Sequence, residues 1–387
     1  MHVALVHMRS ARVGGTESYL NQVSRNLCER GHEVTIVCRS HEDAPDPRVR
    51  FVVLHRLALG GAARIVAFAR DVERHVREAA YDLVVGLGRT WSQDVIRVSG
   101  GCHATYLERA HPYSTSRLGR WLGPGLARIS PKHRAILAIE ARALAPGAAR
   151  CVIVNSDLVR RDVVARYGGD PARIRLIRNG VDLARFHPRH RDQSGRELRE
   201  RLGISGPGPV VLFLGSNYGR KGLDVLLEAF PAFLREHPGA KLLVVGADAD
   251  PAGWKGHARS LSIDSAVHFL GKRGDTEACY GAADLYVLPT RYDSFAYTVL
   301  EALASGVPVV VSDGAGASEV VDASCGAVIP WTASPAQLGA ALSSWGSPDR
   351  RLQASAACRR IAEENGSDAA AERTIALFEE LASGARR

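Results

Sequence analysis

Two carboxylates placed eight positions apart are the first candidates for chemistry in this chain of 387 residues. Asp293 follows the apolar run 283–289, which predicts a strand. Glu301 lies inside 298–305, which predicts a short helix that ends at Gly306. In parallel α/β sheets, the loop after a strand and the following helix N-terminus lie at the edge where ligands bind. Carboxylates at this edge suit the hydroxyl groups of a sugar and a ribose, because they accept hydrogen bonds from hydroxyls.

Two adjacent cations form the second candidate group. Arg220 and Lys221 come a few residues after the apolar run 210–214, which predicts another strand. Cations at this position can meet a diphosphate, because negative charge grows on a departing nucleoside diphosphate as its bond to the sugar breaks. The backbone amides of Phe295 and Ala296, at the start of the predicted helix, offer further donors to such an anion.

The stretch that begins at Asp293 resembles the signature of the retaining glycosyltransferases of family 4. In that signature seven residues separate two glutamates, and the second lies in Leu-Glu-Ala before a small residue and Gly-x-Pro-Val-Val, which this chain matches at 300–310. Asp293 takes the place of the first glutamate, so the carboxylate is kept on a stem one methylene shorter. Ala296 stands where many members have Gly, which restricts how closely the backbone can approach a ligand. The resemblance covers nearly the whole chain.

The resemblance implies a role for each of these residues. Asp293 would act in the catalytic centre by holding a hydroxyl of the transferred sugar, and Glu301 would bind the donor ribose. The donor diphosphate would be bound by two cations and two amides: Arg220, Lys221, Phe295 and Ala296. The family is thought to react on one face of the sugar, with the leaving phosphate helping to deprotonate the acceptor. We therefore expect Asp293 to position the sugar rather than to attack it, unlike the nucleophile of a retaining hydrolase.

Three further candidates lie in the N-terminal half. Gly15 and Thr16 lie in the loop after the first predicted strand, which the family uses near the donor phosphates and the acceptor. A Gly-Gly pair is also typical of a tight turn, and the third glycine of a dinucleotide fingerprint is lacking here. His103 follows a strand and two glycines, and it matches the position of an active-site histidine that contacts the donor sugar in many members. A neutral imidazole can donate or accept such a hydrogen bond.

The expected activity is the retaining transfer of a hexose, glucose from UDP-glucose, to a hydroxyl of a glycan or glycolipid. The shortened form of 215–222 is most similar to that of the glucosyltransferases of the lipopolysaccharide core, which indicates such an acceptor. A GDP-mannose-dependent mannosyltransferase and a nucleotide-sugar epimerase of the same fold stay open. A basic nucleic-acid-binding protein is disfavoured, because the sequence has no aromatic-interleaved basic strand and no zinc or helix-turn-helix signature.

We expect the donor to be a nucleotide sugar and no metal cofactor to be needed, because the implied fold generally works without one. Asp248 and Asp250 spell the Asp-x-Asp pattern by which a different glycosyltransferase fold binds a metal. They follow a predicted strand of the second domain, where acids are typical of a turn. No other part of the sequence groups metal ligands.

The elements that position these residues alternate between apolar strands and amphipathic helices. Strand patterns at 2–7 and 33–38 enclose a helical pattern at 17–30, and a second series begins at 210–214 and continues at 241–246. Further strands are expected at 51–54, 83–86, 95–98, 151–154, 267–270 and 309–311. This order predicts an α/β protein with doubly wound parallel sheets. The resemblance implies the GT-B fold, in which two Rossmann-like domains face each other across a cleft.

The boundary between the two domains is expected in a polar stretch after Pro188. Residues 1–188 would form the acceptor-side domain, completed by a crossover helix at about 368–387. Residues 205–367 would form the domain that binds the nucleotide sugar, and 189–204 would be a linker.

The composition is that of a globular protein with material for two cores, since 46% of the residues are hydrophobic. The net charge of +9 suits an acidic acceptor or an anionic membrane surface. Residues 118–128 mix Arg with Trp and Leu and could lie in a membrane interface, although a solvated loop before a packed helix is the alternative. The seven scattered cysteines are expected to be free thiols. We therefore expect a cytoplasmic protein, attached peripherally to the inner face of the cytoplasmic membrane.

Overall fold

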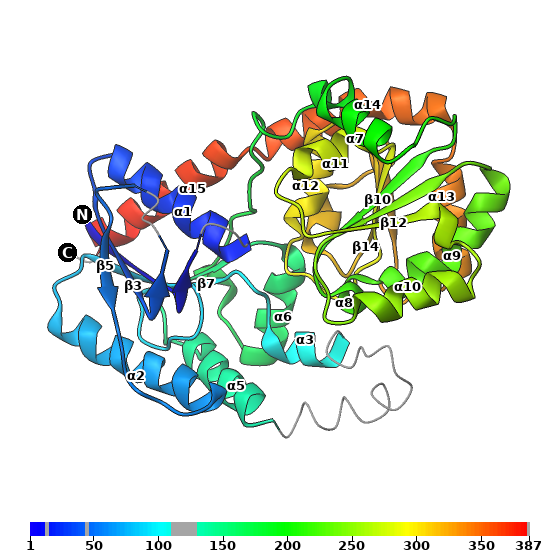
Figure 1. The fold of residues 1–387 in the computed structure, drawn as a ribbon. Helices are drawn as coiled ribbons and strands as arrows, with labels where there is room; N and C mark the ends of the chain where they lie inside the picture. Colours follow the sequence, from blue (N-terminus) through cyan, green and yellow to red (C-terminus); the bar gives the residue numbers. More distant parts are fainter. Residues whose placement is uncertain (12–14, 43–45, 110–129, 385–387) are drawn as a thin grey trace. The chain divides into compact units, whose positions relative to one another are not determined.

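The computed structural model describes residues 1–11, 15–42, 46–109 and 130–384. The chain forms two compact units (Figure 1). The first unit combines the N-terminal part, up to Asn179, with the C-terminal residues from Asp368. The second unit contains Gly180–Ser367. Among the described residues, no helix is both long and apolar enough to cross a membrane.

The first unit is built on a parallel sheet of seven strands in the order β5-β3-β1-β6-β7-β8-β9. Its strands are apolar along most of their length, as is typical of a parallel sheet that is covered on both faces. They are β1 (His2–Val6), β3 (Glu33–Cys38), β5 (Arg50–Val53), β6 (Leu83–Gly86), β7 (Val95–Val98), β8 (Cys151–Val154) and β9 (Ile174–Leu176). Two short strands, β2 (Arg9–Ser10) and β4 (Ser40–His41), pair beside it.

Helices cover both faces of this sheet. On one face, α1 (Gly15–Glu29) and α15 (Ser367–Gly384) share a core with the strands, in which Leu20 and Phe378 are fully buried. On the other face, α2 (Gly61–Glu78) packs against α5 (Pro131–Leu144) (Figure 1). The shorter helices are α3 (His103–Arg109), α6 (Asp157–Tyr167) and η1 (Pro171–Arg173). The C-terminal helix therefore completes the core of the unit that begins the chain.

The second unit contains a parallel sheet of six strands in the order β12-β11-β10-β13-β14-β15. The strands are β10 (Val210–Leu214), β11 (Lys241–Val245), β12 (Val267–Gly271), β13 (Leu285–Leu288), β14 (Val309–Ser312) and β15 (Gly326–Ile329). Its helices are η2 (Pro188–Arg191), α7 (Ser194–Arg201), α8 (Tyr218–Lys221), α9 (Leu223–Glu236), α10 (Pro251–Ser260), η3 (Asp264–Ala266), α11 (Thr276–Ala282), α12 (Tyr297–Ala304), η4 (Gly316–Val320), α13 (Pro335–Ser344) and α14 (Pro348–Glu364). Helix α9 packs on α13, whereas α12 packs on α14 and α11 on α7. One large apolar cluster joins the two layers through the sheet.

Each sheet contains one point at which the order of its strands reverses. In the first sheet the point lies between β1 and β6, and in the second between β10 and β13. The loops that leave two such strands run to opposite faces of the sheet, so a crevice opens at their carboxyl ends. The topology thus predicts one ligand-binding crevice in each unit, at its strand-order reversal.

The predicted fold class is confirmed: both units are parallel α/β sheets, and most strands lie within one or two residues of their predicted bounds. Four strands were not expected from the sequence: the short pair β2 and β4, and β9 and β15 of the two main sheets. Strand β15 opens with Gly326, where an added Cβ would lie 2.3 Å from the carbonyl oxygen of Val309. This glycine lowers the apparent strand propensity, but it allows the close approach to β14.

The stretch 189–204, for which the sequence predicts a linker, instead forms helical structure within the second unit. Leu198 of α7 is buried, and Gly195 lies directly against the backbone of α11. Arg199 donates hydrogen bonds to the carboxylate of Asp284 (2.8 Å) and to the carbonyl oxygen of Ala282 (2.8 Å). The polar composition that suggests a linker therefore belongs to the exposed face of a short packed helix.

Gly195 gives a direct test of this packing. A Cβ at Gly195 would lie 2.3 Å from the carbonyl carbon of Gly281, so Gly195→Ala must separate α7 from α11. We expect it to lower the free energy of unfolding by about 2 kcal/mol, as overpacking of a core does. Gly256 in α10 is the matched control, since nothing lies within 4 Å of its Cβ position. Gly256→Ala should be neutral or stabilising in urea denaturation, and an equal loss in both variants would contradict the close contact.

Candidate active site

The site in the second unit is centred on an ion pair between Lys221 and Asp293. Lys221 ends α8, which follows β10, and Asp293 lies in the loop after β13. The side-chain nitrogen of Lys221 donates a hydrogen bond to Oδ2 of Asp293. Nη1 of Arg220 lies 3.4 Å from the same oxygen and donates to the carbonyl oxygen of Tyr292 (2.9 Å). Because β10 and β13 are neighbours at the reversal of strand order, their loops bring the predicted cations and the first carboxylate together.

The other oxygen of Asp293 binds the start of α12. Its Oδ1 accepts hydrogen bonds from the backbone N–H groups of Phe295 (3.1 Å) and Ala296 (2.7 Å). Ala296 has a φ of 66°, in the left-handed region that a residue with a Cβ seldom occupies. The two amides that were predicted to bind phosphate thus lie at the N-terminus of α12, as expected, and they donate hydrogen bonds to Asp293.

The electrostatics of the pair are those of a buried but compensated charge. Only 6% of Lys221 is exposed, and burial lowers its pKa against the attraction of Asp293. Burial by itself would raise the pKa of Asp293, but Lys221 and then Arg220 more than reverse this effect and hold the pKa well below its ordinary value. Asp293 is therefore a carboxylate at every physiological pH, and Lys221 depends on it as its counterion.

Further contacts fix the two loops to each other. The guanidinium of Arg291 donates two hydrogen bonds to the carboxylate of Asp224 in α9, at 3.0 and 2.8 Å. The backbone N–H of Arg291 donates to the carbonyl oxygen of Arg220 (3.0 Å). A Cβ at Gly215 would lie 3.3 Å from the stem of Lys221, so the glycine leaves room for the lysine to lie across it. The ion pair is thus held by its surroundings rather than by its own flexible side chains.

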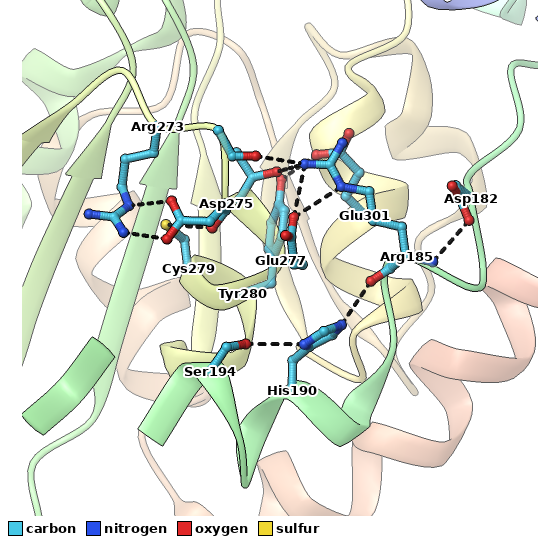
Figure 2. A network of polar contacts seen from close by, with 12 residues as sticks. Asp182, Arg185, His190, Ser194, Arg273, Asp275, Glu277, Cys279, Tyr280 and Glu301 are labelled. Carbon is cyan, nitrogen blue, oxygen red and sulfur yellow. Dashed lines mark hydrogen bonds and ion pairs between the residues drawn. The ribbon is translucent and has the colours of Figure 1, made fainter. Parts of the chain in front are cut away.

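Glu301, the second carboxylate of the pattern, lies on α12 within a polar network (Figure 2). The hydroxyl of Tyr280 donates to Oε2 of Glu301 over 2.7 Å. Nearby, Arg185 donates to Glu277 from two of its nitrogens, at 3.0 and 2.8 Å. Burial raises the pKa of Glu301, while the bond from Tyr280 and the charge of Arg185 oppose that rise. Sequence reasoning missed Tyr280 and Arg185, because no spacing rule links them to Glu301.

The remaining predicted residues, Gly15, Thr16 and His103, belong to the first unit. Gly15 is the exposed first residue of α1, whereas Thr16 and His103 line a cavity of about 430 Å³. His103 begins α3, and its Nε2 lies 2.9 Å from Nδ1 of His133 on α5. Its backbone N–H donates to both oxygens of Glu140, at 3.0 and 2.9 Å. The cavity lies at the strand-order reversal of the first sheet.

The acids of the Asp-x-Asp pattern have local partners. Oδ2 of Asp248 accepts from the backbone N–H of Tyr218 (2.7 Å), and its Oδ1 accepts from the indole of Trp254 (3.0 Å). Asp250 is the N-cap of α10, where it accepts from the N–H of Gly253 (2.9 Å). Both acids therefore stabilise the starts of helices, as the turn interpretation predicts.

Comparison with known proteins agrees with this architecture. The family described as "Glycosyl transferases group 1" matches residues 194–363, and the family "Glycosyltransferase Family 4" matches residues 13–185. The chain belongs to the family 4 glycosyltransferases. The two matches together span most of the chain, and they divide it in the same region in which the two units separate.

Two sequence relatives illustrate the range of this glycosyltransferase family. The lipopolysaccharide glucosyltransferase WaaG of Escherichia coli strain K12 is 26% identical over 333 residues, which cover 85% of each protein. The D-inositol 3-phosphate glycosyltransferase of Corynebacterium kroppenstedtii is 27% identical over 367 residues, covering 87% of this chain and 78% of that protein. The chain is thus related to glycosyltransferases that are named for different substrates.

Solved structures show the same fold at lower identity. A crystal structure of WaaG, described as a glycosyltransferase involved in lipopolysaccharide biosynthesis, superposes with a TM-score of 0.81 at 24% identity, covering 97% of this chain and 99% of that one. The structure of Anabaena Alr3699/HepE in complex with UDP-glucose has a TM-score of 0.70 at 18% identity, with 98% and 100% covered. This glycosyltransferase therefore has the expected GT-B fold of two Rossmann-like domains.

The buried ion pair predicts a pH-dependent loss of stability in Asp293→Asn. The amide cannot neutralise Lys221. At pH 7 we therefore expect the free energy of unfolding of this variant to be about 3 kcal/mol lower than that of the wild type. Because the folded-state pKa of Asp293 is lowered, its stabilisation is complete above the unfolded value of about 3.9 and is lost as the pH falls below it.

Urea denaturation between pH 7 and pH 3 measures this difference. The gap between wild type and Asp293→Asn should narrow towards pH 3, whereas Asp264→Asn, at an exposed acid, should match the wild type throughout. A gap that stays constant with pH would mean that Asp293 stabilises the fold without its charge.

Proposed function

We propose that this glycosyltransferase transfers glucose from UDP-glucose to a hydroxyl of a glycan or glycolipid, with retention of the anomeric configuration. The observation that carries the proposal is the cluster of Arg220, Lys221 and Asp293 at the strand-order reversal of the second sheet, in the same unit as Glu301. A nucleotide sugar offers this site a diphosphate, a ribose and a hexose, which match its cations and its two carboxylates in chemical type. UDP-glucose binding by the structural neighbour HepE supports the choice of donor.

Each residue then has one task. Arg220 and Lys221 bind the diphosphate and stabilise the charge that develops on it, which is the kind of interaction that raises a reaction rate. Glu301 accepts hydrogen bonds from the ribose hydroxyls, and Tyr280 keeps one of its oxygens in place. Asp293 holds a hexose hydroxyl from a side chain that is already oriented by Lys221 and by the amides of Phe295 and Ala296.

The reaction step follows from this arrangement. The bond between the anomeric carbon and the diphosphate oxygen breaks, and the acceptor oxygen forms its bond to the same face of that carbon. The acceptor proton passes to an oxygen of the leaving UDP, so that no side chain has to act as a base. Both oxygens of Asp293 already accept hydrogen bonds, which favours a positioning role over a nucleophilic one.

The acceptor that we propose is a lipopolysaccharide-core type of glycan or glycolipid. Its support is the likeness to WaaG, which is named for glucosyl transfer to lipopolysaccharide. In the first unit, we assign the cavity lined by Thr16 and His103 to substrate binding. No metal cofactor is part of the proposal, because Arg220 and Lys221 supply the positive charge that a metal would otherwise provide.

The donor assignment predicts selective binding of uridine nucleotides. In isothermal titration calorimetry, UDP and UDP-glucose should bind more tightly than GDP or ADP. Arg220→Ala should weaken UDP binding about tenfold or more, the loss expected for one charge-assisted hydrogen bond. Arg220 is the variant of choice because it is more exposed than Lys221 and removing it leaves the buried pair intact.

Arg235→Ala is the matched control, since it removes an exposed arginine from the last turn of α9. It should bind UDP as the wild type does. Selectivity for GDP would replace the proposal with a mannosyltransferase, and the absence of binding by any nucleotide would overturn the donor site altogether.

We further propose that the protein works as a peripheral protein on the inner face of the cytoplasmic membrane. The predicted contact segment 118–128 lies outside the described residues, but a second segment of the first unit has suitable character. Leu57 and Leu59, between β5 and α2, are 100% and 98% exposed. The exposed cations Arg56 and Arg64 flank them in sequence. Apolar side chains bordered by arginine suit the boundary between anionic headgroups and acyl chains.

The double variant Leu57→Ser/Leu59→Ser tests this contact. It should bind phosphatidylglycerol vesicles at least about tenfold more weakly in sedimentation, because two leucines lose their burial in the bilayer. Leu352→Ser in α14, which alters a leucine that is 78% exposed in the second unit, should bind as the wild type does. Equal binding by all three proteins would exclude Leu57 and Leu59 from the membrane contact.

A further inference from the structure

The cavity of the first unit has a lining that the donor reaction does not use. It lies where the loops after β6 and β7 meet helix α5, and its volume is about 430 Å³. This is within the size range of small-molecule sites. Three of its lining residues carry a permanent positive charge, namely Arg89, Arg97 and Lys132. Only one carboxylate, Glu140, lines it among the described residues.

Glu140 is already committed to other groups. Its two oxygens accept from the backbone N–H of His103, and Oε1 also accepts from the hydroxyl of Tyr167. These bonds attach α5 to the start of α3 and to the end of α6. Glu140 therefore links three helices through hydrogen bonds. As a single carboxylate it can neutralise at most one of the three cations.

Arg89 is held in an unfavourable backbone conformation at the cavity wall. Its φ is 61°, and the preceding Gly88 also has a positive φ of 109°. An arginine in the left-handed region costs conformational free energy that a glycine or asparagine would avoid. Among the residues that the structure describes, its guanidinium makes no hydrogen bond or ion pair, and burial lowers its pKa against the attraction of Glu140. The guanidinium is thus half-buried at the cavity with its donors unused.

Arg97 is a second cation without a carboxylate partner in the described part of the chain. It is 1% exposed on β7, its guanidinium lies 3.8 Å from the ring centroid of Tyr19, and Nη2 donates to Asn179 (2.7 Å). Within the described ranges, its Nε and Nη1 have no hydrogen-bond partner. A buried guanidinium without a counterion is destabilising. The positive charge of Arg97 is therefore a specific property of this part of the cavity wall and does not reflect the general charge of the protein surface.

We propose that this cavity binds a phosphate group carried by the acceptor, with Arg89 and Lys132 as its direct ligands. This inference rests on the proposed function. It narrows the class of acceptor proposed there to one that carries a phosphorylated sugar or polyol. The planar fork of Arg89 can hold two phosphate oxygens, while the ammonium of Lys132 adds a point charge. A phosphomonoester carries nearly two negative charges at neutral pH, which two permanent cations balance.

The geometry of Lys132 agrees with a ligand role. It lies in the first turn of α5, is exposed, and its stem lies beside Gly61 of α2, where an added Cβ would be 3.6 Å from Cδ of the lysine. Arg134, two residues further along α5, is also exposed but does not line the cavity. The same helix therefore offers one cation inside the proposed subsite and one outside it.

Calorimetric titration of the full chain with inorganic phosphate and with glucose 6-phosphate tests the proposal, with unphosphorylated glucose as the neutral probe. All titrations contain saturating UDP, so that Arg220 and Lys221 are already occupied. We expect both phosphates to bind and glucose not to bind. Arg89→Gln and Lys132→Gln should each weaken phosphate binding about tenfold or more, whereas Arg134→Gln should leave it unchanged.

Two results would overturn the subsite. These are no phosphate binding by the wild type in the presence of UDP, and equal phosphate affinity in all variants. The UDP titration of the same proteins tests the donor site separately. Loss of UDP binding with phosphate binding retained would reject the proposed function, whereas the reverse pattern would reject only the phosphate subsite.

Discussion

The buried contact between Lys221 and Asp293 is the interaction on which the second unit's site depends. Moving an ammonium and a carboxylate out of water has a large unfavourable free energy, which their attraction offsets only when both are well placed. Here the placement is provided by the sheet: β10 and β13 are neighbours, and the loops that leave them carry one partner each. The pair is therefore a product of strand order, and any change that shifts one loop exposes or isolates a charge.

The surroundings of the pair follow from the same requirement. Gly222 has a φ of 80°, and a Cβ there would lie 2.1 Å from the carbonyl oxygen of Pro289, so the loop after β10 can approach the end of β13 only with glycine. Arg291 adds bonds to Asp224 and to the backbone of Arg220. In the proposed reaction such pre-organisation would favour catalysis, because charges that are already oriented need not rearrange as the leaving phosphate develops its charge.

The sequence predicted the sheets and the proximity of the two cations to Asp293, because both depend on short-range patterns. Apolar runs mark parallel strands, and strand, loop and helix in succession place Arg220, Lys221 and Asp293 at one sheet edge. The sequence could not reveal Tyr280 beside Glu301, or Arg89, Lys132 and His133 around one cavity, because these contacts join elements that are far apart along the chain. It also misread 189–204, where the polar residues cover one face of α7 and Leu198 fills the other.

The two units share one sheet topology but differ in the charge balance at the strand-order reversal. At the reversal in the second sheet, Asp293 compensates the cations, so the proposed diphosphate would share Lys221 and Arg220 with a resident carboxylate. At the reversal in the first sheet, Glu140 is tied to His103 and Tyr167, and the described lining leaves Arg89 without such a partner. A compensated site can release its anion readily, since Asp293 restores neutrality when the product leaves. An uncompensated site favours retention of its anion, and this difference suits the two proposed ligands, a nucleotide product that is released and a phosphorylated acceptor that stays bound.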